Sequence, residues 1–505
     1  MRRDVEPRAG AGREPTRGRP PDPARDISSQ ALLRFLTTRR WFGAKGRQPQ
    51  GAHVVDAVRV GTAGWIARID VALQDGVERY QVTLRDPEPG TSGQGYELVE
   101  GLEDPAFLRA LGTVISRGTA LEGSRLRWVV SWMKEIPDEL PAPRMAGAEQ
   151  SNTSLIFGDR AIMKLYRRLE PGEHPDAEIA RFLTTRAHFS HTPELLATAT
   201  FESPNGAEVA AILQRFLPGS RDAWRVALDR GREAFGVEAT TGIPFVVEAE
   251  TLGTITREMH LALASDERDP AFAPEPATIE DVRQWAEAVR QSTDQTLALL
   301  DRSRAGGSLS GEDARDAAAV LEQQAVVRGL VDGWVTEIGD DAGCRIRHHG
   351  DYHLGQVLQA ADGEFLVIDF EGEPARPLDE RRAKHSGLRD VAGMMRSFAY
   401  AAATCAEEAR GELGDRDART RAQRWERELR EAFMRGYLPE GREHPPFLPQ
   451  ARARLDVLLS LFEAEKVLYE LSYELNNRPT WVWIPLRGLI AMMAHSGGTS
   501  ARKRS

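Results

Sequence analysis

The sequence predicts an α+β protein in which a smaller, strand-rich part precedes a larger helical part. Apolar and polar residues alternate from Val54 to Leu84, as expected of half-buried strands. A second strand pair surrounds the turn at Gly158-Asp159, and from about residue 247 onward most apolar residues recur at helical spacing. Because 505 residues exceed one ordinary core, we expect two to four domains or subdomains.

Composition and local signals divide the chain in order. Residues 1–27 are rich in Arg, Pro and Gly and are predicted to be a disordered tail, as are residues 495–505. Ser28 or Ser29 can cap a first helix. The predicted parts between the tails are an N-terminal cap and intermediate subdomain at 28–135, a strand-rich lobe at 136–217 containing a helix opened by Pro175, and a helical lobe with one β-hairpin at 218–494.

The charge balance favours a small-molecule substrate. With 66 basic and 76 acidic residues, a formal charge of −10 argues against a dedicated nucleic-acid or membrane-surface binder. Cys344 and Cys405 are too few for a disulfide framework or a thiolate zinc site, which favours a reducing compartment. No apolar run reaches the roughly 20 residues that span a bilayer, and no signal peptide is visible, so a cytoplasmic protein is expected.

The stretch "HHGDYHLGQVL", residues 348–358, concentrates polar side chains just before a predicted hairpin. The turn at Asp362-Gly363 pairs Val357-Leu358 with the strand that leads to Asp369. Asp351 and Gln356 precede the first strand, and Asp369, Glu371 and Glu373 follow the second. The hairpin therefore brings carboxylate and amide oxygens to one end.

These oxygens suit phosphoryl transfer. Mg²⁺ prefers one or two carboxylates together with water and phosphate oxygens, and a further carboxylate can accept a hydroxyl proton. Asp351 precedes Gln356 by five positions and Asp369 by eighteen, which matches the catalytic loop and metal-binding aspartate of the protein-kinase-like fold.

That fold needs a lysine on a strand of the small lobe and a glutamate on the following helix. Lys164 lies in the apolar strand "AIMKLYRR", and Glu178 follows fourteen residues later. No GxGxxG precedes the lysine; "GAEQSNTSLIFG" stands in its place. We expect this hairpin tip to offer donors to the phosphates from Ser151, Asn152, Thr153 and Ser154, although it could also be an ordinary exposed hairpin.

The histidines allow another interpretation. His348, His349 and His353 could form a transition-metal site and support a metallohydrolase. Their spacing within a loop is not a known ligand spacing, however, and no thiolate completes a set. Histidines that brace a catalytic loop by hydrogen bonds are the favoured interpretation.

Several stretches resemble the maltokinases over nearly the whole chain except both tails. They are "RRWFGAKGR", "EQSNTSLIFGD", "HHGDYHLGQVL", "VIDFEGEP", "ERRAKHSGLRDVAGMMRSFAYAA" and "YELSYELNNRPTWVWIPLRGL". The resemblance implies a bilobal, protein-kinase-like fold, related to aminoglycoside phosphotransferases, with an N-terminal cap. It also implies ATP and Mg²⁺ as cofactors and the conversion of maltose to maltose 1-phosphate, a feed into glycogen or α-glucan synthesis.

The resemblance assigns roles position by position. Asp351 is implied to be the base on the anomeric hydroxyl, Gln356 and Asp369 the Mg²⁺ ligands, and Glu371 a further candidate at the metal site. Lys164 would hold the α- and β-phosphates, Glu178 would orient it, and the hinge from Gln214 to Phe216 would receive adenine. One departure is Gly387, where the family pattern has proline; Asp390, just beyond it, is expected to anchor the catalytic loop.

The sugar is expected in the helical lobe. Lys466, Tyr469, Glu470 and Tyr473 are spaced i, i+3, i+4, i+7 and share one helix face, which could instead be a packing stripe. Other functions stay open: a phosphotransferase for another sugar or an aminoglycoside, or a kinase-like module without catalysis. If the chain acts as the maltokinases do, it could associate with a maltose-producing enzyme.

Overall fold

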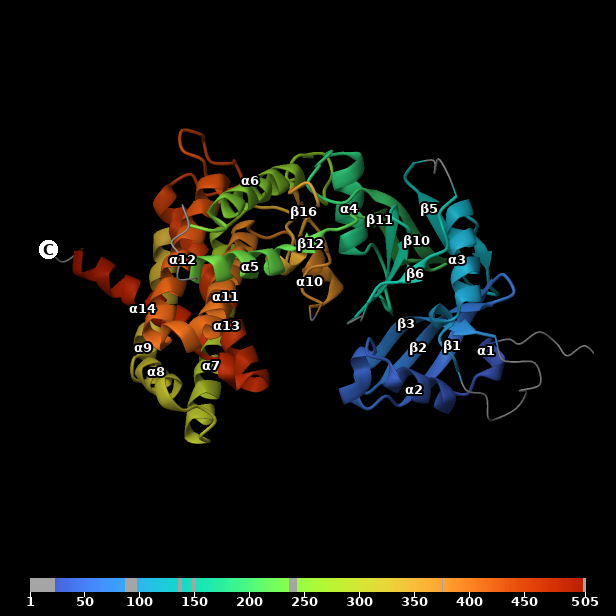
Figure 1. Ribbon diagram of the computed structural model, residues 1–505, viewed down its shortest axis with the longest axis horizontal. Coiled ribbons are helices and arrows are strands. Elements are labelled where there is room, and N and C mark those ends of the chain that lie inside the picture. Colours follow the sequence, from blue (N-terminus) through green and yellow to red (C-terminus); the bar gives the residue numbers. More distant parts are fainter. Residues whose placement is uncertain are drawn as a thin grey trace, which may run out of the picture. The chain divides into compact units, whose positions relative to one another are not determined.

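The computed structural model describes residues 23–86, 98–134, 139–147, 151–235, 243–374 and 376–502. The chain forms two compact units (Figure 1). Unit 1 comprises Met1–Gly158, Met163–Pro171 and Thr198–Ala211, and unit 2 comprises Asp159–Ile162, Gly172–Ala197 and Ile212–Ser505. The predicted cap and most of the strand-rich lobe therefore share unit 1, and the predicted helical lobe lies in unit 2.

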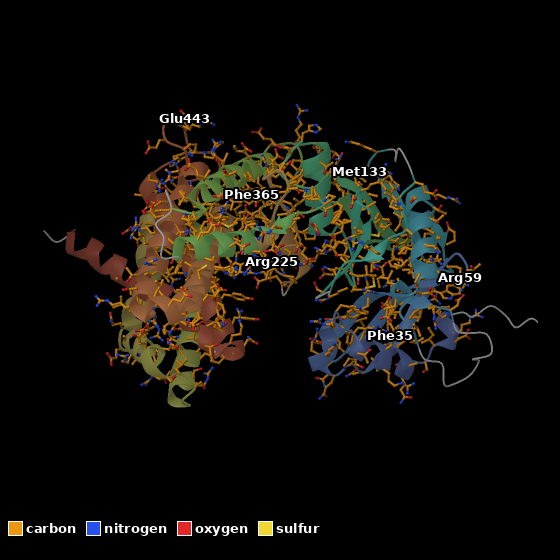
Figure 2. All side chains as sticks on the ribbon, in the orientation of Figure 1. Phe35, Arg59, Met133, Arg225, Phe365 and Glu443 are labelled. Carbon is orange, nitrogen blue, oxygen red and sulfur yellow. The ribbon has the colours of Figure 1, made fainter. Side chains whose placement is uncertain are left out.

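The first sheet of unit 1 is antiparallel. Its order is β1-β2-β3-β9, formed by β1 (Gly51–Val60), β2 (Gly64–Leu73), β3 (Gly76–Arg85) and β9 (Arg168–Leu169). Helix α2 (Ser29–Thr38) begins after Ser28, whose hydroxyl accepts a hydrogen bond from the Ala31 N–H at 3.2 Å. Phe35 of α2, labelled in Figure 2, packs into a buried cluster with Ile69 and Tyr80 of the sheet. The predicted capped helix and alternating strands are confirmed.

The second sheet has the order β4-β5-β10-β11-β8-β7-β6. Its strands are β4 (Leu121–Glu122), β5 (Arg127–Trp132), β6 (Arg144–Met145), β7 (Thr153–Phe157), β8 (Ala161–Leu165), β10 (Leu195–Ser203) and β11 (Gly206–Arg215), and helix α3 (Pro105–Arg117) precedes β4. Gly158 has a φ of 55° at the predicted turn between β7 and β8, a conformation that glycine adopts easily. Because β4 and β5 share this sheet with β7 and β8, the boundary predicted near residue 135 separates strands that belong together.

Unit 2 is mainly helical, as predicted. Its helices are α4 (Pro175–Thr185), α5 (Ala223–Phe235), α6 (Val246–Leu263), α7 (Ile279–Ala305), α8 (Gly311–Glu322), α9 (Gln324–Ile338), α10 (Leu378–Arg382), α11 (Leu388–Leu413), α12 (Asp415–Tyr437), α13 (Arg452–Asn477) and α14 (Trp483–Arg502). Its short strands are β12 (Arg221–Asp222), β13 (Glu275–Pro276), β14 (Cys344–Arg345), β15 (Val357–Gln359) and β16 (Phe365–Val367). Strands β12, β15 and β16 form a three-stranded sheet, and β13 pairs with β14.

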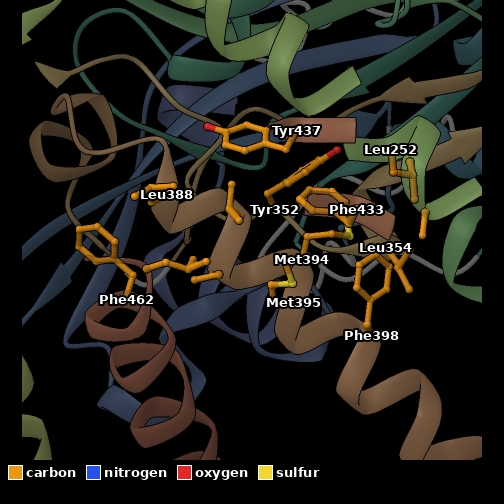
Figure 3. Close-up of a cluster of buried hydrophobic side chains, with 14 of the residues drawn as sticks. Leu252, Tyr352, Leu354, Leu388, Met394, Met395, Phe398, Phe433, Tyr437 and Phe462 are labelled. Atoms are coloured by element: carbon orange, nitrogen blue, oxygen red, sulfur yellow. The ribbon is translucent and has the colours of Figure 1, made fainter. Parts of the chain in front are cut away.

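Short 3₁₀ turns complete the described elements: η1 (Gly43–Arg47), η2 (Gly101–Glu103), η3 (Leu354–Gln356) and η4 (Pro479–Trp481). The buried core of unit 2 gathers around α11 (Figure 3). Leu388, Met394, Met395 and Phe398 of α11 are fully or almost fully buried there, together with Leu354 beside the predicted catalytic loop. The core of the helical unit is therefore continuous with the segment that carries Asp351.

The chain ends differ in part from the predicted tails. A one-turn helix α1 occupies Pro23–Asp26, inside the segment predicted as disordered, while residues 1–22 lie outside the described residues. Helix α14 continues to Arg502, so the predicted start of a C-terminal tail at residue 495 falls within a helix. Among the described residues, no helix has the length and apolar character needed to cross a bilayer.

Candidate active site

The β15–β16 hairpin brings two predicted metal ligands together. Val357 pairs with Val367, and the Ile368 N–H donates to the Gln356 carbonyl at 3.0 Å. Gln356 and Asp369 are therefore near neighbours at one end of the hairpin. Asp369 has a φ of 68°, a left-handed conformation that costs a non-glycine residue on the order of 1–3 kcal/mol. Such strain is typical of functional positions, where surrounding contacts hold it in place.

The loop that carries Asp351 is fixed from helix α11. The buried Asp390 carboxylate accepts hydrogen bonds from the His349 N–H at 2.8 Å and the Gly350 N–H at 3.0 Å. The Leu354 N–H donates to Ser397 Oγ at 3.1 Å. Buried backbone donors need partners, so these side chains satisfy the loop as well as position it. The predicted anchoring role of Asp390 is confirmed.

Two of the three histidines, His349 and His353, brace this loop by hydrogen bonds. His349 Nε2 lies 2.9 Å from the Ile368 carbonyl, and its Nδ1 accepts a hydrogen bond from the Asp351 N–H at 3.3 Å. His353 Nδ1 accepts from the Gly355 N–H at 3.0 Å. His348 is buried, and this burial lowers its pKa to about 3. Among the described residues, no three His, Cys, Asp or Glu side chains gather as a metal site of their own, so the histidine metal site is not supported.

Asp351 has a cationic neighbour. Lys466 Nζ, on α13, lies 3.6 Å from Asp351 Oδ1, and His353 Nε2 lies 3.9 Å from Asp351 Oδ2. Burial lowers the pKa of His353, the largest effect on that ring, which favours its neutral form. The permanent positive charge beside Asp351 is therefore that of Lys466. This pairing spans more than one hundred residues of sequence.

A pocket of about 60 Å³ opens at this ion pair. Its wall includes Asp351, Lys466 and Tyr469. Burial and the nearby Glu373 carboxylate raise the pKa of Tyr469 to about 12, so its hydroxyl stays protonated and can donate a hydrogen bond. Two of the four residues predicted to bind sugar, Lys466 and Tyr469, thus lie at the site.

The other two predicted sugar residues do not line this pocket. Glu470 is largely buried, and its carboxylate accepts a hydrogen bond from Arg396 Nε at 2.9 Å. Burial raises the pKa of Glu470, while Arg396 opposes that shift. Tyr473 is exposed, with the Arg478 guanidinium 5.4 Å from its ring centroid. Glu470 is paired with Arg396 at the interface with α11, and a contact of Glu470 or Tyr473 with the sugar stays a prediction.

The wall of the Asp351 pocket also contains charged residues that the sequence did not single out. Arg389 on α11 binds Glu465 on α13 at 2.6 Å. Arg376 binds Glu373 at 3.0 Å and lies 3.5 Å from Glu465. Glu465 stands next to Lys466 in sequence, but only the packing of α13 against α11 shows that both reach the site.

A larger cavity of about 240 Å³ adjoins this pocket. Both cavities are lined by Gly350, Glu373, Arg376, Arg389 and Glu465. The larger one is also lined by Trp285 and His385, whose rings stack with centroids 4.6 Å apart. Aromatic faces flanked by charged hydrogen-bonding groups are suited to a polar ring.

Glu178, on α4, is held by two arginines of unit 2. Arg347 Nη2 lies 2.8 Å from one carboxylate oxygen, and Arg382 Nη2 lies 2.8 Å from the other. Its pairing with Lys164 stays a prediction. Lys164 lies on β8 as predicted, with its ammonium 5.6 Å from the Tyr166 ring centroid. The first turn of α4 also supplies Asp176, unnoticed in the sequence, whose Oδ1 accepts from the Phe370 N–H at 3.0 Å next to Asp369.

The predicted phosphate-binding tip is only partly described. Ser151 and Asn152 precede β7, and Thr153 and Ser154 are in it, while residues 148–150 lie outside the described residues. Thr153 is fully buried, and its hydroxyl accepts a hydrogen bond from Arg167 Nε at 2.6 Å. The Thr153 hydroxyl is therefore engaged within unit 1, and a contact from Thr153 to phosphate stays a prediction.

The residues present fit a nucleotide and a metal. Gln214, in the predicted hinge, has a buried Nε2 with no hydrogen-bond partner among the described residues, as expected of a group that awaits a ligand. The Phe216 N–H instead donates to the Arg160 carbonyl at 3.0 Å. Gln356 and Asp369 offer the hard oxygens that Mg²⁺ takes, and Glu371 lies two residues further, 3.9 Å from His174 Nε2.

Comparisons with known proteins find relatives of this chain among the sugar kinases. A model of the maltokinase N-terminal cap domain matches residues 35–98. A glucosamine kinase of Mycolicibacterium smegmatis (strain ATCC 700084 / mc(2)155) is 30% identical over 360 residues, which are 70% of this chain and 79% of that protein. One of Streptacidiphilus jiangxiensis is 32% identical over 255 residues, 50% of this chain and 52% of that protein.

The fold is also found among solved structures. A glucosamine kinase in complex with glucosamine, ADP and inorganic phosphate superposes with a TM-score of 0.62 at 23% identity, covering 88% of this chain and 94% of that one. The predicted fold class, a mixture of helices and sheets with a kinase-like fold and an N-terminal cap, is confirmed. This chain belongs to the maltokinase-like sugar kinases, the capped family that includes the glucosamine kinases.

Proposed function

We propose that this sugar kinase transfers the γ-phosphoryl group of ATP to the anomeric hydroxyl of maltose and releases α-maltose 1-phosphate, a precursor for glycogen or α-glucan synthesis. The observation that carries the proposal is the Asp351–Lys466 pair, which lies in a pocket that adjoins a second cavity. In this role, Asp351 accepts the proton of the attacking hydroxyl. Lys466 pairs with that carboxylate and lies close to where negative charge gathers during transfer.

The rest of the machinery is assigned from the same arrangement. Gln356 and Asp369 would hold Mg²⁺, with Glu371 as a further oxygen donor nearby; bound there, the metal neutralises phosphate charge. Lys164 would bind the α- and β-phosphates, and Glu178 would orient it. The orphaned amide of Gln214 would meet adenine, while Ser151, Asn152 and Ser154 remain the proposed donors at the phosphate-binding tip.

The joined cavities favour an acceptor with two rings. One sugar ring would place its reacting hydroxyl at Asp351, beside Lys466 and Tyr469. The second would lie toward Trp285 and His385, past the ion pair of Arg389 with Glu465. The charged side chains of Lys466, Arg389 and Glu465 can each form hydrogen bonds with sugar hydroxyls. Such bonds give specificity without requiring a charged substrate.

Glucosamine is the second candidate, because the curated relatives are glucosamine kinases. Glu373 and Glu465 line the Asp351 pocket and could bind an ammonium group. This alternative fills only one cavity with a single ring. Under it, the Trp285 cavity contributes little to substrate affinity.

The deciding experiment supplies ATP, Mg²⁺ and, separately, maltose, glucosamine, glucose and an aminoglycoside. ADP release measures turnover, and phosphorus NMR identifies the product, since a phosphate on an anomeric carbon couples to the single anomeric proton. We expect the highest kcat/KM with maltose and an anomeric phosphate. A higher kcat/KM with glucosamine than with maltose would mean that glucosamine is the substrate. Co-purification with a maltose-producing enzyme would test the proposed association.

A further inference from the structure

We propose that His260, on α6, is a positioning residue of the catalytic loop, acting through Asp390 and held in turn by Tyr437. His260 Nε2 lies 3.0 Å from Asp390 Oδ2, the same oxygen that accepts the His349 N–H. The inference rests on the proposed role of Asp351 as the base, because the contact matters for catalysis only if the loop must be held in place.

The contact completes the bonding of a buried carboxylate. Asp390 is 2% exposed, and two loop amides alone would leave its buried charge poorly compensated. Burial by itself would raise the pKa of Asp390, but the hydrogen bond from His260 and nearby histidines hold it well below its usual range. Asp390 therefore stays charged and forms strong bonds to the His349 and Gly350 amides.

His260 is itself oriented by a second contact. Its ring is fully buried, and Nδ1 lies 2.9 Å from the Tyr437 hydroxyl on α12. Nε2 donates to the Asp390 carboxylate, and Nδ1 shares a hydrogen bond with the Tyr437 hydroxyl, which can act as donor or acceptor. The chain from Tyr437 through His260 and Asp390 to the Gly350 amide has a donor and an acceptor at every step.

Two glycines make this arrangement sterically possible. A Cβ on Gly253 of α6 would lie 2.0 Å from the Phe433 carbonyl oxygen, and one on Gly436 of α12 would lie 2.0 Å from the Glu250 carbonyl oxygen. Helices α6 and α12 thus touch backbone to backbone, which brings Tyr437 to His260. Figure 3 draws Tyr437 and Tyr352 as members of one buried cluster.

The same contact explains the departure at Gly387. A Cβ there would lie 2.9 Å from His260 Nδ1. The proline of the family pattern could not occupy this position without displacing the ring. Glycine at 387 therefore leaves room for the His260 ring.

Helix α6 also reaches the loop on the other side of Asp351. Thr256, one turn before His260, has its hydroxyl 3.0 Å from the Tyr352 hydroxyl. Thr256 and His260 are four residues apart and share one face of α6. His260 restrains Gly350 through Asp390, and Thr256 restrains Tyr352 by a direct contact. Both neighbours of Asp351 are thereby restrained by one helix.

The test compares His260→Ala, His260→Gln and Tyr437→Phe with the control Thr293→Val. Thr293 is similarly buried, and its hydroxyl bonds only within its own helix, to the Val289 carbonyl. Gln can place a donor Nε2 near that of histidine. We expect His260→Ala to lower kcat about 10- to 100-fold with KM for ATP within about 3-fold, since misplacement of a catalytic group costs rate rather than nucleotide binding. In His260→Gln, kcat should return to within about 5-fold of wild type. The kcat of Tyr437→Phe should lie between that of His260→Ala and that of wild type.

Hydrogen–deuterium exchange of the peptide containing residues 349–354 provides a measurement that does not depend on knowing the sugar substrate. We expect faster exchange in His260→Ala and in Tyr437→Phe but not in Thr293→Val. The inference is overturned if exchange is unchanged in both variants, or if the Gln variant is no better than Ala in kcat. If wild type phosphorylates neither maltose nor glucosamine, the proposed function fails while exchange still decides whether His260 holds the loop.

Discussion

Lys466 Nζ lies 3.6 Å from Asp351 Oδ1, which joins helix α13 to the loop before the β15–β16 hairpin. The pair places a fixed positive charge against the proposed base, within the pocket that Tyr469 also lines. In phosphoryl transfer, where charge neutralisation and positioning account for most of the rate, such a cation acts on the transition state more than on substrate binding.

We therefore predict that Lys466→Met lowers kcat about 100-fold or more, while KM for the sugar rises by less than about 10-fold. Steady-state kinetics with saturating ATP measure both values. Tyr473→Phe is the matched control on the same helix, because Tyr473 is exposed and does not line the pocket. A variant that changes only KM would mean that Lys466 binds sugar and does not assist transfer.

Glu470 is predicted to stabilise the fold. Removing it leaves Arg396, which is 4% exposed, as an uncompensated buried charge, so Glu470→Ala should destabilise the protein by about 3–5 kcal/mol. Urea unfolding measures this difference. The folded variant should keep a KM for sugar within about 2-fold of wild type, because Glu470 does not line the Asp351 pocket. A large rise in KM with unchanged stability would restore Glu470 as a sugar ligand.

Acid should weaken the protein through its buried histidines. The pKa of His348 is lowered to about 3 and that of His385 is lowered too, both because burial penalises the charged ring. Between the folded pKa of His348 and the unfolded value near 6.5, the unfolded chain binds the extra proton, so stability falls as pH falls through that window. The loss is about 1.4 kcal/mol per pH unit for each histidine.

Urea unfolding of wild type and His348→Gln between about pH 4.5 and 7 isolates this contribution from that of the carboxylates. We expect the free energy of unfolding to depend less steeply on pH in the variant, by about one proton. Equal slopes would mean that His348 is protonated in the folded protein. The comparison concerns slopes, so an overall loss of stability in the variant does not obscure it.

Glu178 offers a test of the nucleotide side. Arg347 and Arg382 bind both of its carboxylate oxygens, so Glu178→Gln should lower the unfolding midpoint. If Glu178 also orients Lys164, KM for ATP should rise about 10-fold, and Lys164→Met should raise it further. Fluorescence titration with a nucleotide analogue provides an independent measure. An unchanged KM for ATP would limit Glu178 to its arginine partners.

The sequence predicted those features that depend on local pattern. The Asp362-Gly363 hairpin, the capped helix after Ser28 and the bracing of the loop by His349 and His353 all follow from neighbours in the chain. The α13 residues show the limit. Lys466 and Glu470 share a helix face by spacing, yet one reaches Asp351 and the other is drawn to Arg396, since the packing of α11 decides between them.

His260 shows the same limit more strongly. A single histidine in a helix has no local pattern that marks it, and its partners are 130 and 177 residues away in sequence. Only the close approach of α6 and α12, at Gly253 and Gly436, brings Tyr437 to His260. Half-buried ion pairs such as Arg389 with Glu465 were equally hard to predict, because charged residues are common on helices.

The central claim is that Asp351 is the base for phosphoryl transfer to a sugar. The most direct measurement is sugar-dependent ADP release by Asp351→Asn beside wild type, with nucleotide binding followed in parallel. We predict that the variant loses at least about 1,000-fold in kcat with maltose while it binds ATP within about 3-fold of wild type, because the amide cannot accept the proton but leaves the phosphate-binding groups intact. A near-wild-type kcat in Asp351→Asn would contradict the account.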